Sequence, residues 1–149
     1  MGFNEKGGVY EKIFADNVIM SADIKTKKLS YPSQVINRDR NTSFNKSLRE
    51  NLVVFECVNR LLDKGYKPED IWLEKPYRLG HLQKSGRADI CVSHEGKTIL
   101  IIECKTAGAE YENALKLLKT NGVNFFRIAN KTKMQAGLSF TPPTLKTAK

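Results

Sequence analysis

The sequence predicts a single α/β domain spanning residues 1–149, because stretches with helical and with strand periodicity follow one another along the chain. Apolar residues recur at helical spacing in 46–64 and 109–119, and four consecutive aliphatic residues occupy 99–102. A chain of this length buries roughly two-thirds of its unfolded surface. No apolar run is long enough to cross a bilayer, so no membrane partner is expected.

The first 46 residues are expected to form a basic N-terminal arm of irregular structure. Their apolar pieces are short, Pro32 interrupts them, and only Tyr10–Val18 has the pattern of a helical turn. Seven Lys or Arg residues lie between Lys25 and Arg49 against a single acid, Asp39. Such a run is typical of a solvated arm, and it also suits phosphate contact.

The first helix is expected to begin at a cap formed by Ser43 or Asn45. It runs to about Lys64, where Gly65 supplies the stop. Its inward stripe consists of aliphatic residues at helical spacing: Val54, Val58, Leu61 and Leu62. Glu50 falls on the same stripe, one helical turn before its first member, where a carboxylate is out of place. This anomaly makes Glu50 a candidate functional residue.

The second half of the predicted core, which spans residues 47–122, combines three strands and a helix. The expected elements are, in order, a turn at 67–70, an extended stretch at Ile71–Leu79, a loop through Gly86, strands at Arg87–Ser93 and Thr98–Lys105 joined at 94–97, and an amphipathic helix at Ala109–Lys119 that ends at Asn121-Gly122. The last strand is apolar on both faces, which favours a place in the middle of the sheet.

Charge, cysteine content and the N-terminus narrow the function classes. The formal net charge of +9 suggests a polyanionic partner, although residues 123–149 hold five basic residues and no acid, which leaves 20 basic and 16 acidic groups before them. Cys57, Cys91 and Cys104 have no metal-type spacing and are expected to be reduced and mostly buried. The first residues do not have the pattern of a signal peptide, so a cytoplasmic location is expected.

Three charged residues, Asp89, Glu103 and Lys105, lie on or beside the two strands that flank the 94–97 turn. Side chains alternate along a strand, so Glu103 and Lys105 share a face. A three-residue loop at 95–97 would place Asp89 directly opposite Glu103, and an even-numbered loop would do so only with a β-bulge. The spacing therefore makes a geometric demand that a structure either meets or fails.

The residue types at this site suit a divalent metal. Two carboxylates on adjacent strands repel each other, and a hard cation between them removes the repulsion. Magnesium, or manganese in its place, prefers oxygen ligands, which Asp89, Glu103 and the backbone carbonyl of Cys104 can supply. Such an ion acidifies bound water and stabilises the charge that develops on a phosphate. With Lys105 orienting the water or neutralising that charge, the predicted chemistry is hydrolysis of a phosphodiester.

A simpler interpretation is an ion pair between Glu103 and Lys105 at a sheet edge. The triplet Glu-x-Lys is common, and taken alone it favours that interpretation. Glu103 follows four aliphatic residues of a predicted central strand, however, and charges in such positions are seldom kept without a partner or a task. With Asp89 in the preceding strand, the metal site is preferred.

Two short segments, Gly86-Arg87-Ala88-Asp89-Ile90 and Ile101-Ile102-Glu103-Cys104-Lys105, resemble the PD-(D/E)xK nuclease signature. More closely, the sequence is similar to the N-terminal nuclease domain of type I restriction enzyme R subunits and of related fused methyltransferase–endonuclease polypeptides. The likeness covers about Tyr31 to Gly122, with supporting stretches at 51–58, 73–77 and 106–111. No proline precedes the aspartate motif, a departure that the family allows.

The resemblance implies a restriction-endonuclease-like mixed central sheet flanked by helices, magnesium dependence and cleavage of double-stranded DNA. It also implies that an acid on the first helix helps to position the metal; Glu50 is the first candidate and Glu56 the second. Lys84 and Arg87, which flank Ser85-Gly86, are candidates for contact with DNA phosphates. Solvation in an exposed loop is the alternative for both.

Three functions remain open from the sequence. The preferred one is a nuclease module that works beside methyltransferase, translocase or specificity parts, because nothing here resembles a P-loop, a methyl-donor site or a sequence-reading helix. The alternatives are a catalytically inactive DNA-binding or docking module on the same scaffold, and a truncated remnant without a selected role. One such site cuts one strand of a duplex, so a homodimer is compatible with the nuclease.

Residues 123–149 form an atypical tail. Nucleases of the resembled family continue their second helix through a Gln-x-x-x-Tyr motif that supports the active site, and this motif does not follow Gly122. Under plausible codon choices, Val123–Asn130 read one base earlier encode a string that contains it, so a frameshifted tail is one hypothesis. A genuine strand at Val123–Ala129 is the other. Codons that cannot give Gln and Tyr in the shifted frame would exclude the frameshift.

Overall fold

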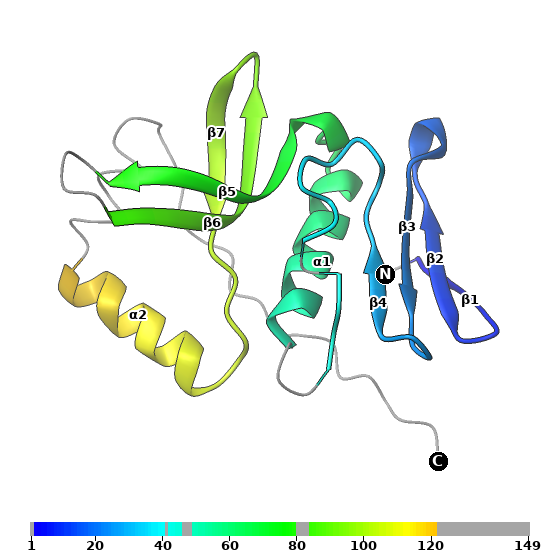
Figure 1. The fold of residues 1–149 in the computed structure, drawn as a ribbon, viewed down its shortest axis with the longest axis horizontal. Helices are drawn as coiled ribbons and strands as arrows, with labels where there is room; N and C mark the ends of the chain where they lie inside the picture. Colours follow the sequence, from blue (N-terminus) through cyan, green and yellow to red (C-terminus); the bar gives the residue numbers. More distant parts are fainter. Residues whose placement is uncertain (1, 41, 46–48, 80–83, 122–149) are drawn as a thin grey trace. The chain divides into compact units, whose positions relative to one another are not determined.

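The structure, a computed structural model, describes residues 2–40, 42–45, 49–79 and 84–121. The chain divides into two compact units, residues 1–104 and residues 105–149. The first unit contains β1 (Asn4–Lys6), β2 (Val9–Ile13), the 3-10 turn η1 (Ala15–Asn17), β3 (Ile19–Asp23), β4 (Lys28–Ser30), α1 (Arg49–Asp63), the 3-10 turn η2 (Pro68–Asp70), β5 (Ile71–Leu79), β6 (Lys84–His94) and β7 (Lys97–Ile102) (Figure 1). The second unit contains α2 (Ala109–Asn121). The predicted α/β class is confirmed.

The N-terminal segment is a sheet. β1 to β4 pair antiparallel in chain order, so the expected irregular arm is wrong. The helical turn expected at Tyr10–Val18 is also wrong, since only Ala15–Asn17 forms a 3-10 turn there. Met20, Ala22 and Leu29 are buried on one face of the sheet. Their alternation is short and is interrupted by exposed lysines, so the period-two signal is weak in the sequence.

Helix α1 carries the predicted inward stripe. Val54, Val58, Leu61 and Leu62 are all buried. Gly65 ends the helix with a φ of 84°, a left-handed conformation that glycine adopts without strain, and the amide of Tyr66 donates to the carbonyl of Leu61. The predicted cap Ser43 is wrong, because Ser43 forms a β-bridge with Lys28. The cap Asn45 stays a prediction, since residues 46–48 lie outside the described residues and the described part of the helix begins at Arg49.

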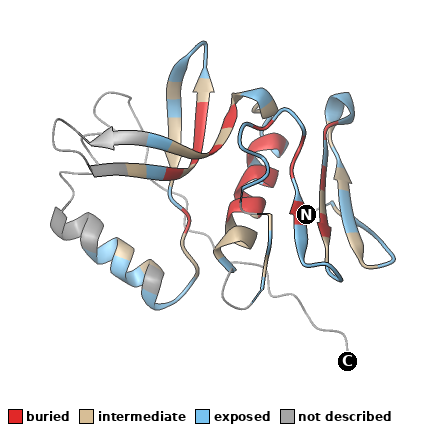
Figure 2. Cartoon of the chain, in the orientation of Figure 1, coloured by how far each residue is buried: buried red, intermediate tan, exposed pale blue. Residues whose placement is uncertain are grey.

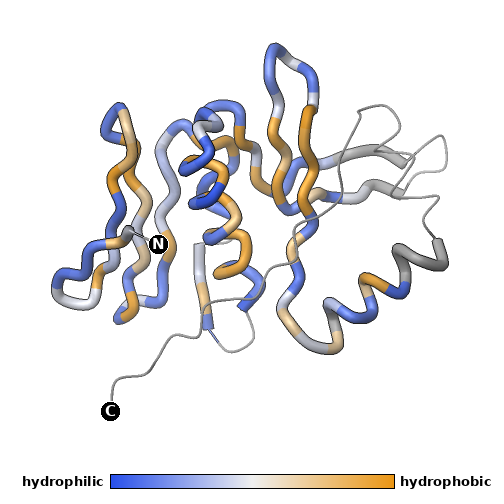
Figure 3. The backbone as a smooth tube through the Cα atoms, turned by 180° about the vertical axis from the view of Figure 1, so that it is seen from behind, coloured by the Kyte–Doolittle hydropathy of each residue, from blue (hydrophilic) through white to orange (hydrophobic). Residues whose placement is uncertain are grey.

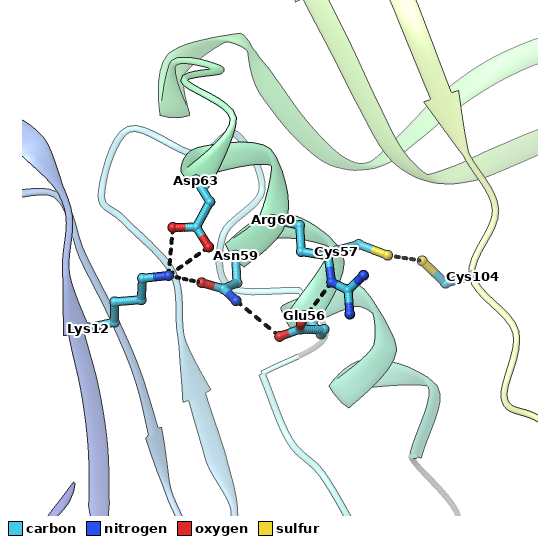
Figure 4. A network of polar contacts seen from close by, with 7 residues as sticks. All are labelled: Lys12, Glu56, Cys57, Asn59, Arg60, Asp63 and Cys104. Carbon is cyan, nitrogen blue, oxygen red and sulfur yellow. Dashed lines mark hydrogen bonds and ion pairs between the residues drawn. The ribbon is translucent and has the colours of Figure 1, made fainter. Parts of the chain in front are cut away.

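The N-terminal sheet packs on one side of α1 (Figure 2). The ring of Phe55 lies 5.8 Å from that of Phe3 and 5.5 Å from that of Tyr31. Lys12 Nζ reaches Asp63 Oδ1 at 2.6 Å and Asn59 Oδ1 at 2.8 Å (Figure 4). Asn59 is 1% exposed, so this lysine satisfies a buried amide as well as an exposed acid.

The second sheet has the order β5-β6-β7, with antiparallel pairing throughout. Parallel pairing in the described residues is limited to an isolated bridge between Ile36 and Trp72. The loop was expected to run through Gly86, but β6 already begins at Lys84. Residues 84–86 pair with β5 instead of forming the end of the loop. The row Leu73, Ile90 and Ile102 crosses all three strands, and its first two members are fully buried.

Strand β7 carries the aliphatic run 99–102, which gives it a continuous hydrophobic trace in Figure 3. Among the described strands it lies at the edge of its sheet, and Ile99 is 40% exposed. The prediction of a central strand is therefore wrong for the part of the sheet that is described. Apolar residues on both faces of a strand indicate that both faces can be buried. They do not determine which strands pair with its two edges, and the sheet topology decides that.

Helix α2 was predicted at Ala109–Lys119 and is observed at Ala109–Asn121. No helix in the described residues is both long and apolar enough to cross a membrane. Both hypotheses for the tail concern residues 123–149, which lie outside the described residues.

Candidate active site

The hairpin of β6 and β7 determines which side chains meet. His94 pairs with Lys97 across the two-residue turn Glu95-Gly96, whose φ angles of 49° and 73° are typical of a type I′ turn. An even-numbered loop alone would turn Asp89 away from Glu103. The register shifts at Val92/Ser93, however, and beyond this bulge Ile90 pairs with Ile102.

The ladder ends with the pair Ile90 and Ile102, and Asp89 and Glu103 are the two residues next to this last pair. The bulge thus shifts the register in the direction that an even-numbered loop required, but Glu103 lies beyond the end of β7 and forms no ladder pair with Asp89. That the two carboxylates face each other remains a prediction. Asp89 is half-buried and Glu103 is exposed, so one carboxylate is anchored in the sheet and the other lies open to solvent.

A main-chain hydrogen bond orients Asp89. The amide of Cys104 donates to Asp89 Oδ2 at 2.6 Å. Hydrogen bonds to a charged acceptor are shorter and stronger than neutral ones. The residue that follows Glu103 therefore holds the Asp89 carboxylate, and this hydrogen bond joins the two segments beyond the end of β7.

The thiol of Cys104 is held from the opposite direction. It donates to Cys57 Sγ on α1 at 3.8 Å, and both residues are buried (Figure 4). The hydrogen bond to Cys57 and burial raise the pKa of the Cys104 thiol, and the charges of Asp89 and Glu103 raise it further. Cys104 therefore stays a neutral thiol, which leaves its backbone carbonyl as the group it can offer to a hard cation. The predicted reduced and buried state of all three cysteines is confirmed.

Helix α1 separates the two candidate glutamates. Glu56 bonds to Arg60 Nε at 2.8 Å and accepts from Asn59 Nδ2 at 3.1 Å, so it belongs to the Lys12 network on the side of the N-terminal sheet (Figure 4). Glu50 is half-buried and lies two helical turns before Cys57, so it shares the face of α1 that contacts Cys104. Between the two, the structure favours Glu50.

The three predicted basic residues lie in different surroundings. Lys105 directly follows Cys104, begins the second unit and is half-buried. Arg87 is exposed and pairs through its backbone with Pro76, and Lys84 is the first residue of β6. Lys84 thus lies on a strand and not in the expected loop, whereas Arg87 lies on a strand as predicted. Their contact with phosphate, like the role of Lys105, remains a prediction.

Comparison with protein families gives one match. A model described as the type I restriction enzyme R protein N terminus matches residues 49–137, more than half of the chain. The chain belongs to this family. No curated protein and no solved structure matches it.

Membership in the type I R protein N-terminal family confirms the resemblance drawn from the two signature segments, and it associates the chain with DNA and with other enzyme subunits in general terms. The match begins at Arg49, later than the expected Tyr31, so β1 to β4 lie outside it. It also extends beyond Gly122 and includes the segment Val123–Asn130.

The donor set fits a hard divalent cation. Asp89 and Glu103 carry carboxylate oxygens next to the last pair of the ladder, and the raised pKa of the Cys104 thiol keeps that thiol from competing as a thiolate. Within the described residues, no group of three or more His, Cys, Asp or Glu side chains is arranged to hold a metal ion. A cation here would therefore be held by two carboxylates together with backbone carbonyl and solvent oxygens.

Sequence reasoning missed the contact between Cys57 and Cys104. The sequence contained an indication of this contact. Cys57 lies on the buried face of α1, and Cys104 directly follows the candidate residue Glu103. It also missed Glu74, which has a φ of 52° between the pairs Leu73–Ile90 and Lys75–Ala88. A non-glycine residue with this φ inside a strand has no signature in the sequence.

Proposed function

We propose that this chain is the metal-dependent endonuclease module of a type I-like restriction–modification enzyme, and that it hydrolyses phosphodiester bonds of double-stranded DNA. The observation that supports this most strongly is the hydrogen bond from the Cys104 amide to Asp89 Oδ2, which ties Asp89 to the residue after Glu103 at the end of the bulged hairpin. Family membership supports the same proposal, since the matched family is that of a DNA restriction enzyme subunit.

Asp89, Glu103 and the backbone carbonyl of Cys104 would hold Mg²⁺ or Mn²⁺. When bound, such an ion lowers the pKa of water and stabilises the negative charge of a phosphate under attack. Asp89, fixed by the Cys104 amide, presents its carboxylate in a defined orientation. Glu103, being exposed, is accessible to a phosphate approaching from solvent. Lys105 orients the attacking water or neutralises phosphate charge, and Glu50 assists from α1.

Nicking of a supercoiled plasmid by the full chain in Mg²⁺ tests this proposal. Asp89→Asn, Glu103→Gln and Lys105→Ala are expected to lower the rate by at least about a hundredfold, because even residues that only support metal ligands contribute about 10- to 100-fold. The matched controls Glu112→Gln and Lys97→Ala, both at exposed positions, are expected to retain the wild-type rate.

The outcome that contradicts the proposal is nicking that EDTA or these variants leave unchanged, because it would come from a contaminant or from another site. A wild-type chain that binds duplex DNA without nicking it in Mg²⁺ or Mn²⁺ would instead identify a catalytically inactive DNA-binding or docking module. Methyltransferase, translocase or specificity subunits are the expected partners of the active module, and a homodimer would allow both strands to be cut.

A further inference from the structure

Cys104 connects helix α1 to the candidate metal ligand. Its thiol donates to Cys57 Sγ at 3.8 Å, and its amide donates to Asp89 Oδ2 at 2.6 Å. The two cysteines are 4% and 2% exposed, so neither side chain has room to move to another rotamer without disturbing the core. A displacement of the Cys104 side chain would therefore also displace the amide that holds Asp89.

Cys57, which accepts the hydrogen bond from the Cys104 thiol, lies on a helix that the N-terminal sheet holds in place. Cys57 lies between turns of α1 that are fixed to the N-terminal sheet through Phe55, Asn59 and Asp63, with Lys12 as the common partner of the last two (Figure 4). The thiol of Cys57 thus has a fixed position in the first unit. Asp89, in contrast, is only half-buried, so packing alone restricts its carboxylate less.

We propose that Cys57 is a positioning residue: through Cys104 it fixes the main-chain N–H that orients the Asp89 carboxylate. For its effect on metal binding, this inference rests on the proposed function. Groups that hold a metal ligand in place commonly change metal affinity by about 10- to 100-fold when they are removed. Cys57 touches neither DNA nor metal in this scheme and acts only through Cys104.

The alternative for a buried cysteine is simple packing, and Cys91 provides the matched control for it. Cys91 is 3% exposed, lies in β6 two residues from Asp89, and pairs with Ile101. Cys57→Ala and Cys91→Ala remove the same atoms from sites of equal burial near the same carboxylate. Only the first removes the acceptor of the Cys104 thiol.

Two measurements on the full chain test the inference. Amide hydrogen exchange at Cys104, in metal-free buffer, is expected to become about tenfold faster in Cys57→Ala and to change little in Cys91→Ala. Titration with Mn²⁺ alone is expected to show affinity about tenfold weaker in Cys57→Ala and within about twofold of wild type in Cys91→Ala. Cys57→Ser retains a hydrogen-bond acceptor and is expected to restore both values toward wild type. Cys57→Val, which lacks the acceptor but fills the site, replaces Cys57→Ala if that variant does not fold, with the same expected changes.

Unchanged exchange at Cys104 in Cys57→Ala, or an equal change in Cys91→Ala, would overturn the positioning role. The metal-free measurement separates this outcome from failure of the proposed function. If wild type binds no Mn²⁺ while exchange at Cys104 still depends on Cys57, the metal site is wrong and the connection from Cys57 to Asp89 stands.

Discussion

Asp89 lies in β6 and Glu103 directly follows β7, and one extra residue in β7 at the bulge sets the register that ends next to both of them. The sequence predicted the two acids as a pair and stated the two hairpins that would allow it, because strand alternation is a simple rule. It could not choose between them. The choice depends on whether a Glu-Gly turn with two positive φ angles is compensated further along the ladder, which is a property of the whole hairpin.

Tyr31 is the residue whose burial has the clearest consequence for stability. Its hydroxyl is buried without a hydrogen-bond partner, and burial raises the pKa of the phenol, with Cys104 and Cys57 adding to the rise. The folded pKa thus lies above the unfolded value of about 10. The contribution of this pKa difference to the free energy of unfolding is therefore fully present below about pH 10, and it is lost as the pH rises above that value.

Tyr31→Phe is expected to leave the free energy of unfolding at pH 7 unchanged or to raise it by about 1–3 kcal/mol, since it removes an unsatisfied buried group. Above pH 10 the variant is expected to lose less stability than wild type, by about 1.4 kcal/mol per pH unit. Urea unfolding at several pH values measures both effects. Tyr10→Phe, at a 37% exposed position, is the control, and an equal alkaline loss in wild type and Tyr31→Phe would refute the prediction.

At the scale of elements, the sequence predicted best where a pattern was long. The stripe of α1, the stop at Gly65, the extent of β5 and the start of α2 all agree with the structure. The N-terminal strands were missed because each is only three to five residues long, too short for alternation to be distinguished from chance. Ser43 does not cap α1: it forms a β-bridge with Lys28 of β4, and its carbonyl accepts a hydrogen bond from the Asn51 side chain of α1.

Lys12 joins two of these elements, β2 and α1. Its side chain is 12% exposed and bonds to both Asp63 and the buried amide of Asn59. Lys12→Met keeps the aliphatic stem and leaves Asn59 Oδ1 without this donor, so the free energy of unfolding is expected to fall by about 1–3 kcal/mol. Urea unfolding checks the prediction. Lys6→Met, at an exposed position in β1, should change stability by less than about 0.5 kcal/mol, and an equal effect of both variants would contradict this role.

At the scale of the whole molecule, the first unit extends beyond the family match. β1 to β4 precede Arg49, yet Met20, Leu29, Tyr31 and Val35 contribute buried surface, and Ile36 bonds to the backbone of β5. The core of the first unit thus includes an N-terminal sheet that the resemblance did not reveal. Neither charge nor composition indicated this, because the basic residues of the segment are mostly on its surface.

Removal of residues 1–45 is expected to abolish cooperative unfolding, because the aromatic and aliphatic side of α1 would lose its cover. Fluorescence of Trp72 during urea unfolding reports on this directly, since the truncated chain retains that residue. A truncated chain that unfolds at the wild-type urea midpoint would show that the N-terminal sheet is an accessory to the fold.

The most direct test of the central claim, that Asp89 and Glu103 together hold a divalent cation, is paramagnetic broadening of backbone amide signals by substoichiometric Mn²⁺. We expect the signals of residues 88–90 and 102–104 to broaden first, and Asp89→Asn to remove this effect while the rest of the spectrum is preserved. Broadening that is absent, or that centres on other acidic residues and persists in Asp89→Asn, would contradict the metal site.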